Sequence, residues 1–504
     1  MQKLKFFILL FLLFGFKSFS QLQVESLHYL DQIENSLVYG KDLKTNHSSI
    51  LPSVNTLANY KKGYGRIVKE KGVKRWQSKI YPIANLSVGY ESKSSSSLIY
   101  DTGIGLGLDI SSNKLFFTGK ILPYFNNGGY IRDSIQTVGF IDPATGRPLI
   151  HNLFQQNEII LAYRPNQFFT FLGGHGKNFF GEGYRSLLLS DNAAAQPFLK
   201  VETSFSGLKF VNLYQMWRDN TANSVWHKDT YKFTASHYLS WNITREFNLS
   251  VFETVIWQAN DSLHNRGFDP NYLNPVVFYR PVEYGSGSAD NVLLGANMTY
   301  KFNQNHALYF QFILDDFLLS EIRARSRWWA NKYGTQIGYK TNTFFGKESF
   351  YFQGEFNLVR PFTYSHNHSS LAYGNLNASV AHPIGSNFME VLSILSYPIK
   401  KVRITNQLSY LAYGADSSAV SYGQNIFKSY GLRDKEYDHY MLQGDKYNVI
   451  NERLTISFPI ISEIDLYFNF IYNWRASFNA TNNSQLHSLQ FGIQTRIWNR
   501  YTDI

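Results

Sequence analysis

The sequence predicts a transmembrane antiparallel β-barrel of about 18 strands, and three observations lead to that fold class. Apolar and polar residues alternate with a period of two over most of the chain from about residue 80 onward. The connections between these alternating segments are short and long in turn. The chain is also rich in aromatic residues (17%), lacks cysteine, and has no apolar run of helix-spanning length after its first 20 residues. This combination is typical of outer-membrane barrels.

The first 20 residues have the order of a secretory signal peptide. Lys3 and Lys5 precede the apolar block 6–16, and small residues follow at 18–20. The block is too short to span a bilayer as an anchor helix. We therefore expect residues 1–20 to be a signal peptide and the protein to be exported.

Residues 21–78 differ in pattern from the rest and are predicted to be a small periplasmic segment, part helix and part linker. Apolar residues recur at helical spacing within 27–37. Seven lysines and arginines then gather within 61–75 against the single acid Glu70. This basic run either meets lipid head groups or a periplasmic partner, or is a solvated linker.

Residues 79–504 are predicted to form the barrel. In 464–475, for example, apolar residues at even positions alternate with mostly polar residues at odd positions, so one wall of the strand is apolar and the other largely polar. The predicted strands are 82–92, 97–111, 114–125, 157–164, 168–175, 198–206, 207–217, 230–243, 246–258, 291–302, 306–316, 331–341, 348–358, 388–398, 402–413, 450–460, 463–475 and 486–499.

The lengths of the connections give an independent check on this count. Connections after even-numbered strands are short, as at 165–167 and 303–305, whereas most of those after odd-numbered strands are long, as at 126–156 and 414–449. Short periplasmic turns alternating with long outer loops are the organisation of an outer-membrane barrel. An even strand count places both ends of the barrel in the periplasm.

Charged residues on the polar register of the strands are candidate lumen charges. They are Lys301, Asp315, Glu355, Arg453, Asp465, Arg475 and Arg496. Charges of both signs inside a barrel can cross-link and fill the lumen. The alternative is an open, water-filled pore with charges at its constriction.

The basic charge balance favours anionic partners. The formal net charge is +11, and +8 without the three lysines of residues 1–20. Such a surplus suits outer-membrane lipid and lipopolysaccharide or an acidic surface polysaccharide, or it merely offsets acidic lipid. Nucleic acid is not expected for an exported barrel.

The stretch 173–200 contains five glycines within eleven residues, followed by Leu187–Leu189. It lies between predicted strands five and six. We expect it to fold inward across the lumen, with the glycines passing close to the wall and the leucines forming a small plug. The alternative is a loop that only caps the barrel. Four of its polar residues are expected to face the extracellular mouth as candidate ligand contacts: Lys177, Arg185, Asp191 and Asn192.

Catalytic and metal-binding interpretations find little support. Ser190, Asp191 and His175 are the residue types of an acyl-transfer triad, but no G-x-S-x-G elbow surrounds the serine. The run 366–368 and His382 could ligate a metal, although solvated histidines are commoner on loops. We predict no catalytic residues, no metal and no cofactor.

The loop 434–440 mixes aromatic and charged residues in the longest outer connection. This composition suits contact with sugar or protein. The alternative is a solvated loop whose tyrosines pack on its own base.

Several blocks in one order carry a family resemblance. They are Gly173–Pro197, Asn274–Glu283, Leu314–Phe317, Trp328–Lys332 and Arg360–His366. The first resembles the Wzi family of outer-membrane capsule-assembly proteins, and the others resemble its RemB-type gliding-motility branch. The turn 178–183 departs from the bulkier, proline-containing turn of that family, so no polysaccharide specificity is carried over.

The resemblance implies an eighteen-stranded barrel with an N-terminal periplasmic helical region. It also implies a non-enzymatic role in assembling or attaching capsule or exopolysaccharide, or in gliding, with motility or secretion machinery as possible protein partners. The alternative function is a general or substrate-selective porin. Both place the protein in the outer membrane of a Gram-negative bacterium.

Overall fold

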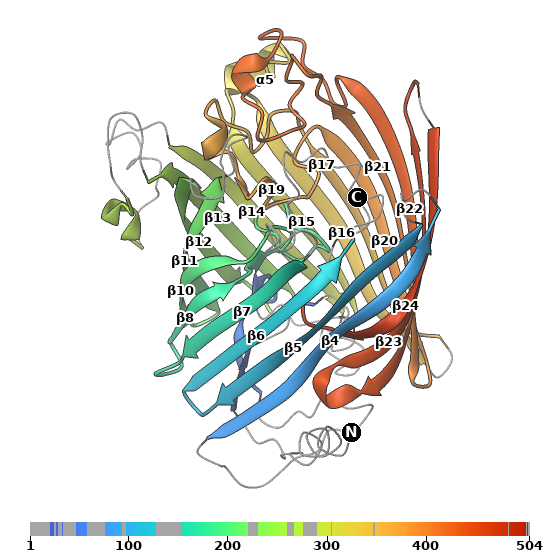
Figure 1. Ribbon diagram of the computed structural model, residues 1–504. Helices are drawn as coiled ribbons and strands as arrows, with labels where there is room; N and C mark the ends of the chain where they lie inside the picture. The colour runs from blue at the N-terminus through green and yellow to red at the C-terminus, as the bar shows by residue number, and fades with distance from the viewer. Residues whose placement is uncertain are drawn as a thin grey trace.

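The computed structural model describes residues 21–24, 27–28, 33, 47–57, 76–92, 97–127, 153–219, 230–259, 267–275, 290–303, 305–345, 348–481, 483–499 and 501. Within these residues, eighteen antiparallel strands close into one barrel (Figure 1). The first barrel strand, β4, pairs with the last, β24, so the sheet has no free edge. The predicted fold class is confirmed.

The barrel strands follow one another around the wall in chain order. Their bounds are β4 (Gln77–Glu91), β5 (Leu98–Ser111), β6 (Leu115–Asn126), β7 (Leu153–Tyr163), β8 (Phe169–Gly176), β10 (Gln196–Phe205), β11 (Leu208–Asp219), β12 (Thr230–Asn242), β13 (Phe247–Gln258), β14 (Asn291–Asn303), β15 (His306–Asp316), β16 (Lys332–Phe345), β17 (Glu348–Val359), β20 (Phe388–Ile399), β21 (Val402–Ala415), β22 (Asp445–Ile461), β23 (Leu466–Phe478) and β24 (Asn483–Thr495). Each predicted strand overlaps one of these.

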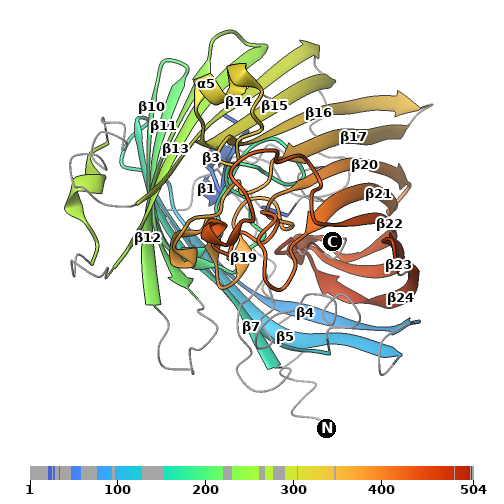
Figure 2. The ribbon, with the colours of Figure 1, turned by 90° about the horizontal axis from the view of Figure 1, so that it is seen from above.

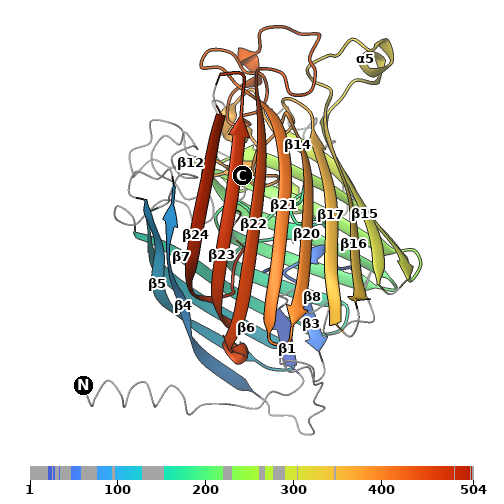
Figure 3. The same cartoon turned by 90° about the vertical axis from the view of Figure 1, so that its right-hand side faces the viewer.

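The connections sort by length as predicted. When the barrel strands are counted from β4 as the first, every connection after an even-numbered strand has at most five residues. The longer connections gather at the opposite end, which lies at the top of Figure 3. We call these the turn end and the loop end of the barrel.

The alternation along each strand separates the lumen from the outer surface. On β23, Tyr467, Asn469 and Asn473 are buried, whereas the intervening Phe468 is exposed. Outward-facing apolar side chains are exposed around the wall, for example Ile104 (66%) and Ile337 (53%). A soluble protein does not expose apolar surface of this extent, but lipid covers it in a membrane. The fold is therefore that of an outer-membrane β-barrel.

Aromatic residues mark both ends of this apolar band. Trp241, Phe205 and Phe302 are exposed beside the short turns, and Tyr90 and Phe125 are exposed near the opposite ends of their strands. Such girdles sit at the two interfaces between lipid and water.

The described part of the N-terminal segment differs from the expected helix outside the barrel. β1 (Gln21–Val24) pairs with β3 (Val54–Leu57), and β2 (Ile50–Leu51) pairs with β9 (Phe179–Phe180). Leu22 and Ile50 are fully buried in the same apolar cluster as inward-facing wall residues. These residues therefore pack inside the barrel, which the sequence pattern did not predict. The signal peptide, most of the expected helix and the basic run 61–75 lie outside the described residues.

Residues 267–275, between β13 and β14, pack against the outside of the barrel wall; they contain η1 (Pro270–Leu273), drawn in green at the left of Figure 2. The ring of Tyr272 lies 4.7 Å from that of Trp257, and the hydroxyl of Tyr214 donates to the carbonyl of Leu273 (3.2 Å). The two wall residues, Trp257 on β13 and Tyr214 on β11, point outward from the barrel. This stretch of chain thus covers part of β11–β13 that would otherwise face lipid.

Below that cover, a polar row departs from the expected apolar outer surface. Asn212, His237 and Glu253 are cross-strand neighbours on β11, β12 and β13, all on outward registers and all buried. His237 and Glu253 approach to 3.8 Å. Ionisable groups that face lipid are costly, and these three side chains are buried at 5%, 8% and 3% exposure.

The remaining elements are short. At the loop end lie α5 (Leu319–Ala324), η2 (Ser369–Leu371), η3 (Tyr430–Leu432) and the pair β18 (Gly374–Asn375) with β19 (Ala378–Ser379), while η4 (Ser462–Ile464) lies at the turn end. Among the helices in the described part of the chain, none is long and apolar enough to cross a membrane.

Candidate functional site

The chain between β8 and β10 folds into the lumen, and we call residues 177–195 the plug. Leu187, Leu188 and Leu189 are all at most 1% exposed and lie in the core cluster that fills the barrel. The inward fold predicted for this stretch is confirmed. The plug is pinned on one side by β9, whose Phe180 stacks on Tyr238 of β12 (4.7 Å between ring centroids).

Two glycines let the plug backbone touch the opposite wall. A Cβ on Gly181 would lie 2.1 Å from Nε2 of Gln311 on β15, and the residue has φ +150°. A Cβ on Gly183 would lie 2.6 Å from Oε1 of Gln336 on β16. No larger residue fits at these distances without moving a buried side chain. These glycines thus allow the plug backbone to pass close to the barrel wall, as the sequence predicted.

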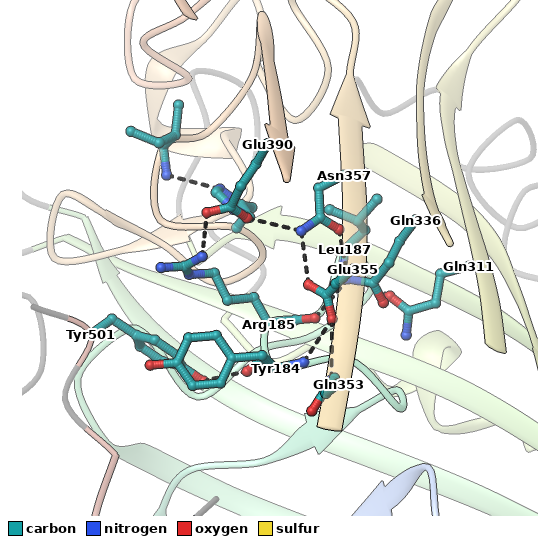
Figure 4. A network of polar contacts seen from close by, with 12 residues as sticks. Tyr184, Arg185, Leu187, Gln311, Gln336, Gln353, Glu355, Asn357, Glu390 and Tyr501 are labelled. Carbon is teal, nitrogen blue, oxygen red and sulfur yellow. Dashed lines mark hydrogen bonds and ion pairs between the residues drawn. The ribbon is translucent and has the colours of Figure 1, made fainter. Parts of the chain in front are cut away.

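Polar side chains of the wall bind the plug backbone directly (Figure 4). The amide of Tyr184 donates to Glu355 Oε2 (2.9 Å), and the amide of Leu187 donates to Gln311 Oε1 (3.0 Å). Gln336 Nε2 donates to the carbonyl of Arg185 (2.8 Å). Three adjacent strands, β15 to β17, therefore satisfy plug groups that would otherwise be buried without partners.

An ion pair crosses from the plug to β20. The guanidinium group of Arg185 contacts the carboxylate of Glu390, and both side chains are at most 1% exposed. Glu390 also accepts from Asn357 Nδ2 and His382 Nε2, each at 2.9 Å. His382 Nδ1 accepts the amide of Ile384 (3.3 Å), so its proton is on the nitrogen that faces Glu390. A buried carboxylate held by three donors is a rigid attachment point.

The end of the chain locks the plug from another side. The hydroxyl of Tyr501 donates to Asp191 Oδ1 (2.6 Å), and Asn499 Nδ2 donates to Asp191 Oδ2 (2.8 Å). The ring of Tyr501 also packs edge-on against Tyr184, and the guanidinium carbon of Arg185 lies 5.5 Å from its centroid. The C-terminal residues therefore enter the barrel and hold the plug.

The loop 360–387 lies over the plug on its loop-end side. The hydroxyls of Tyr364 and Tyr373 donate to the carbonyls of Leu187 (2.8 Å) and Leu188 (2.6 Å). The amide of Tyr364 in turn donates to Asp315 Oδ2 (2.7 Å) on the wall. The N-terminal residues that pack inside the barrel (21–24 and 47–57, which we call the N-terminal strip), the plug and loop 360–387 thus form successive layers across the lumen.

The four polar residues expected at the extracellular mouth are instead buried. Lys177, Arg185, Asp191 and Asn192 are 4%, 0%, 2% and 7% exposed. Lys177 Nζ donates to the carbonyl of Asp191 (3.0 Å), and Asn192 Nδ2 donates to that of Ser379 (3.1 Å). Their predicted exposure is wrong because the plug lies deep in the lumen, where charges must be paired within the protein.

Most of the candidate lumen charges lie on the inward register. Lys301, Asp315 and Glu355 are buried, and Asp315 pairs with Lys332 (3.0 Å). Arg453 and Arg475 are half-buried on the inward faces of β22 and β23.

Asp465 and Arg496 are exceptions, because both lie beyond the ends of their strands. Asp465 is in the turn before β23 with φ 51°, and its carbonyl accepts the amide of Arg496 (3.0 Å). The guanidinium carbon of Arg496 lies 3.6 Å from the centroid of the Tyr467 ring. Both residues therefore close the turn end of the barrel.

The residue types of an acyl-transfer triad are not assembled. Ser190 Oγ is buried and makes no hydrogen bond within the described residues. His382 binds Glu390 inside the lumen, whereas His366 and His368 stay together on the loop, with ring centroids 5.9 Å apart. In the part of the chain that is described, no three metal-ligating side chains are grouped to hold an ion.

An aromatic and charged cluster caps the loop end above these layers. Trp329 Nε1 donates to Glu436 Oε2 (2.8 Å), and the guanidinium carbon of Arg433 lies 4.2 Å from a Trp329 ring centroid. Tyr430 packs on Trp329 (4.6 Å), and Lys332 Nζ lies 5.1 Å from the Tyr430 ring. We call Trp329, Tyr430, Arg433 and Glu436, with the loop 434–440, the cap.

The cap presents side chains to solvent. Tyr437 and Tyr440 are 48% and 55% exposed, so these tyrosines do not pack on the base of their loop. His366 lies edge-on to Tyr430 (5.8 Å). Burial, with a contribution from the nearby Lys332, lowers the pKa of His366 to about 4, so it is neutral at pH 7. The cap therefore offers aromatic faces and hydroxyls on a fixed base.

Sequence reasoning missed the partners that hold these sites. The Glu390–His382–Asn357 group joins residues of two strands and a loop, and the Trp329–Arg433 contact joins loops about a hundred residues apart. The only sequence signal was the position of Trp328–Lys332 and Arg360–His366 among the blocks that carried the resemblance.

No protein-family model matches the chain. No sequence among curated proteins matches it either.

Several solved structures are similar to the chain. One is Wzi of Escherichia coli, an outer-membrane protein involved in group 1 capsule assembly and described as a carbohydrate-binding β-barrel; the TM-score is 0.53 at 11% identity, over 81% of this chain and 83% of Wzi. OprD of Pseudomonas aeruginosa (TM-score 0.42, 10% identity, 84% and 95% covered) and a BenF-like porin of Pseudomonas fluorescens (0.44, 10%, 84% and 99%) are also similar.

At these identities the likeness concerns the closed barrel and nothing finer. The eighteen-stranded barrel expected from the resemblance to Wzi is confirmed, whereas most of the expected N-terminal helical region lies outside the described residues. The RemB-type branch stays a prediction.

Proposed function

We propose that this protein is a non-enzymatic outer-membrane barrel of a Gram-negative bacterium that supports surface-polysaccharide assembly or attachment, or gliding motility of the RemB type. Its loop end is extracellular, its strand ends are periplasmic, and residues 21–78 begin on the periplasmic side. The exposed cap is the surface that meets the polysaccharide.

The packed lumen is the observation that carries this proposal. The plug binds β15–β17 through three backbone groups and β20 through the Arg185–Glu390 pair. A transport channel needs weak, replaceable contacts along its path. Side chains that are fully buried and hydrogen-bonded on several sides instead favour a barrel that serves as a rigid support.

The chemistry of the cap fits an acidic polysaccharide. Tyr437 and Tyr440 supply exposed rings and hydroxyls, and Arg433 holds the base of the cap through Glu436 and Trp329. The net charge of +11 favours the approach of an anionic polymer. The shared fold with a carbohydrate-binding barrel adds support at the level of architecture.

The test compares a deletion strain with one carrying Tyr437→Ser, Tyr440→Ser and Arg433→Gln. Both should lose cell-bound polysaccharide or colony spreading, while the triple variant keeps a normal amount of folded barrel. The matched control is Leu432→Ser, which changes another exposed residue of the same loop. Normal polysaccharide together with normal spreading in the deletion strain would overturn the proposal. Large conductance steps of the purified protein in planar bilayers would favour the porin alternative.

A further inference from the structure

The loop between β15 and β16 carries an exposed apolar and cationic surface that neither the barrel nor the cap uses. Phe317, Leu318, Leu319 and Ile322 are each 43–48% exposed. Three arginines follow at alternating positions, Arg323, Arg325 and Arg327, and all are exposed. We call residues 317–327 the rim loop; it contains α5, at the top of Figure 1.

The rim loop is held in place by its base, so its exposure is a fixed feature. The amide of Leu318 donates to Asn331 Oδ1 (2.9 Å). The carbonyls of Ser326 and Arg327 accept the amides of Asp438 (3.4 Å) and His439 (3.0 Å) of the neighbouring loop. Within the described residues, the three guanidinium groups of the rim loop make no ion pair or hydrogen bond.

The apolar part of the rim loop continues the lipid-facing band. On β15 the outward residues are Leu308, Phe310, Phe312 and Leu314, and Phe317 follows the strand directly. Three extended residues span about 10 Å. The interfacial layer of a bilayer is roughly 5–8 Å thick on each side. Phe317 and Leu318 follow the outward Leu314 within about 10 Å of chain, so they lie close to the lipid-facing band, and the arginines follow further along the loop.

A second arginine site marks the same interface on the adjacent strands. Tyr333 is on the outward register of β16 and stacks near Phe312 (6.2 Å). The guanidinium carbon of Arg360, just after β17, lies 5.5 Å from the Tyr333 ring. Its Nε and Nη2 are buried and have no hydrogen-bond partner within the described residues. An arginine thus packs on the aromatic girdle at the loop end of β15–β17.

We infer that the rim over β15–β17 binds a phosphorylated, acylated glycolipid of the outer leaflet, with lipid A chemistry. Phe317, Leu318, Leu319 and Ile322 contact its acyl and sugar region, and the exposed Arg323, Arg325 and Arg327 contact its phosphates. A free anion would use the arginines but not the apolar residues beside them. An acidic soluble protein would not need continuity with the lipid-facing band. The inference rests on the proposed extracellular position of the loop end.

The experiment measures lipid A bound to the purified full-length barrel in nanodiscs, using bisphosphorylated and dephosphorylated lipid A as probes. The double variant Arg323→Gln, Arg325→Gln should weaken binding of the bisphosphorylated form about 25-fold, since each arginine near a membrane contributes roughly a fivefold effect. The control, Lys400→Gln, Lys401→Gln, removes the same charge at the turn end. If both double variants bind the bisphosphorylated lipid A equally well, the inference is overturned.

Further measurements distinguish this glycolipid from a simple anion as the ligand of the rim loop. Leu319→Gln, Ile322→Gln should weaken both lipid forms, and inorganic phosphate should not compete. Competition by phosphate at millimolar concentration, with no effect of the apolar variant, would show a simple anion site and overturn the inference. Orientation is checked separately in cells: the chain has no cysteine, so Ser320→Cys on α5 should react with a membrane-impermeant maleimide. No labelling would contradict the extracellular loop end, independently of the lipid result.

Discussion

Arg185 of the plug and Glu390 of β20 form an ion pair whose two side chains are 0% and 1% exposed. Breaking one partner of a buried pair leaves an unpaired charge and costs about 3–5 kcal/mol. We therefore expect Arg185→Met to lower the stability of the folded barrel strongly, because Glu390 then keeps only His382 and Asn357. The measurement is urea unfolding in detergent.

The surface pair Arg433–Glu436 provides the matched control, because Glu436 is largely exposed. Arg433→Met should change the unfolding free energy by about 1–2 kcal/mol, because it removes a partly exposed ion pair and the contact of the guanidinium with Trp329. Equal effects of the two substitutions would show that the plug pair is not structurally important.

A second prediction concerns the contact between Gly338 on β16 and Tyr309 on β15. A Cβ on Gly338 would lie 2.0 Å from the Tyr309 ring, and the Tyr309 hydroxyl donates to Glu355 (2.7 Å), which binds the plug. Gly338→Ala should displace the ring and cost roughly 1–3 kcal/mol through overpacking. Gly354→Ala is the control, since its Cβ would meet its nearest neighbour at 3.4 Å. Thermal unfolding of both variants measures the difference, and equal midpoints would contradict the prediction.

The barrel was predictable from sequence because its rules are local. The period of two predicts which face of a strand is polar, and the length of each connection predicts at which end of the barrel that connection lies. The plug contacts were not predictable, since Arg185 and Glu390 are 205 residues apart and no local pattern pairs them. The same holds for Leu22 and Ile50, whose strands form only against partners inside the barrel.

The polar residues of the plug illustrate why the predicted site was misplaced. A sequence of charges beside glycines suggests a solvated loop, and Lys177 and Asp191 would be exposed if the loop stood outside. Tyr501 and Asn499, at the far end of the chain, supply the donors that make burial of Asp191 possible. Burial of a charge depends on partners that the local sequence does not reveal.

A third prediction is a pH effect at His47 in the N-terminal strip. Its Nδ1 donates to Ser240 Oγ (2.9 Å), and its Nε2 accepts from Asn242 (3.2 Å). Burial, helped by nearby Lys209, lowers the pKa of His47 from 6.5 to about 4. The released strip binds a proton more readily than the docked strip between these values, so docking should be stable above pH 6.5 and weaken as the pH falls toward 4.

Hydrogen exchange of residues 47–57 at pH 7 and pH 5 measures this docking. Exchange protection should fall at the lower pH in the unchanged protein. In His47→Gln, which cannot titrate, the difference between the two pH values should shrink. Identical pH profiles for both proteins would contradict a role for His47.

A fourth prediction concerns the chain that covers the outer wall. Tyr272 is 1% exposed against Trp257, whose Nε1 donates to the carbonyl of Gly267 (3.2 Å). Tyr272→Ala should loosen residues 267–275 and let lipid reach Trp257. Brominated lipids should then quench tryptophan fluorescence more strongly than in the unchanged protein. The control is Leu273→Ala, next to it but 45% exposed, for which no added quenching is expected.

The last prediction concerns conductance, because a filled lumen and an open pore differ most there. In planar bilayers the unchanged protein should show no large open-channel steps, since Leu187 and Leu188 are fully buried between the wall and loop 360–387. The double variant Leu187→Asp, Leu188→Asp places two charges in that apolar layer, and their desolvation should expel the plug. Steps should then appear while β-sheet content stays unchanged. Leu432→Asp, at an exposed position beside the cap, should remain silent. If the unchanged protein conducts as strongly as the double variant, the layers across the lumen leave a water-filled path, and the porin alternative is the better explanation.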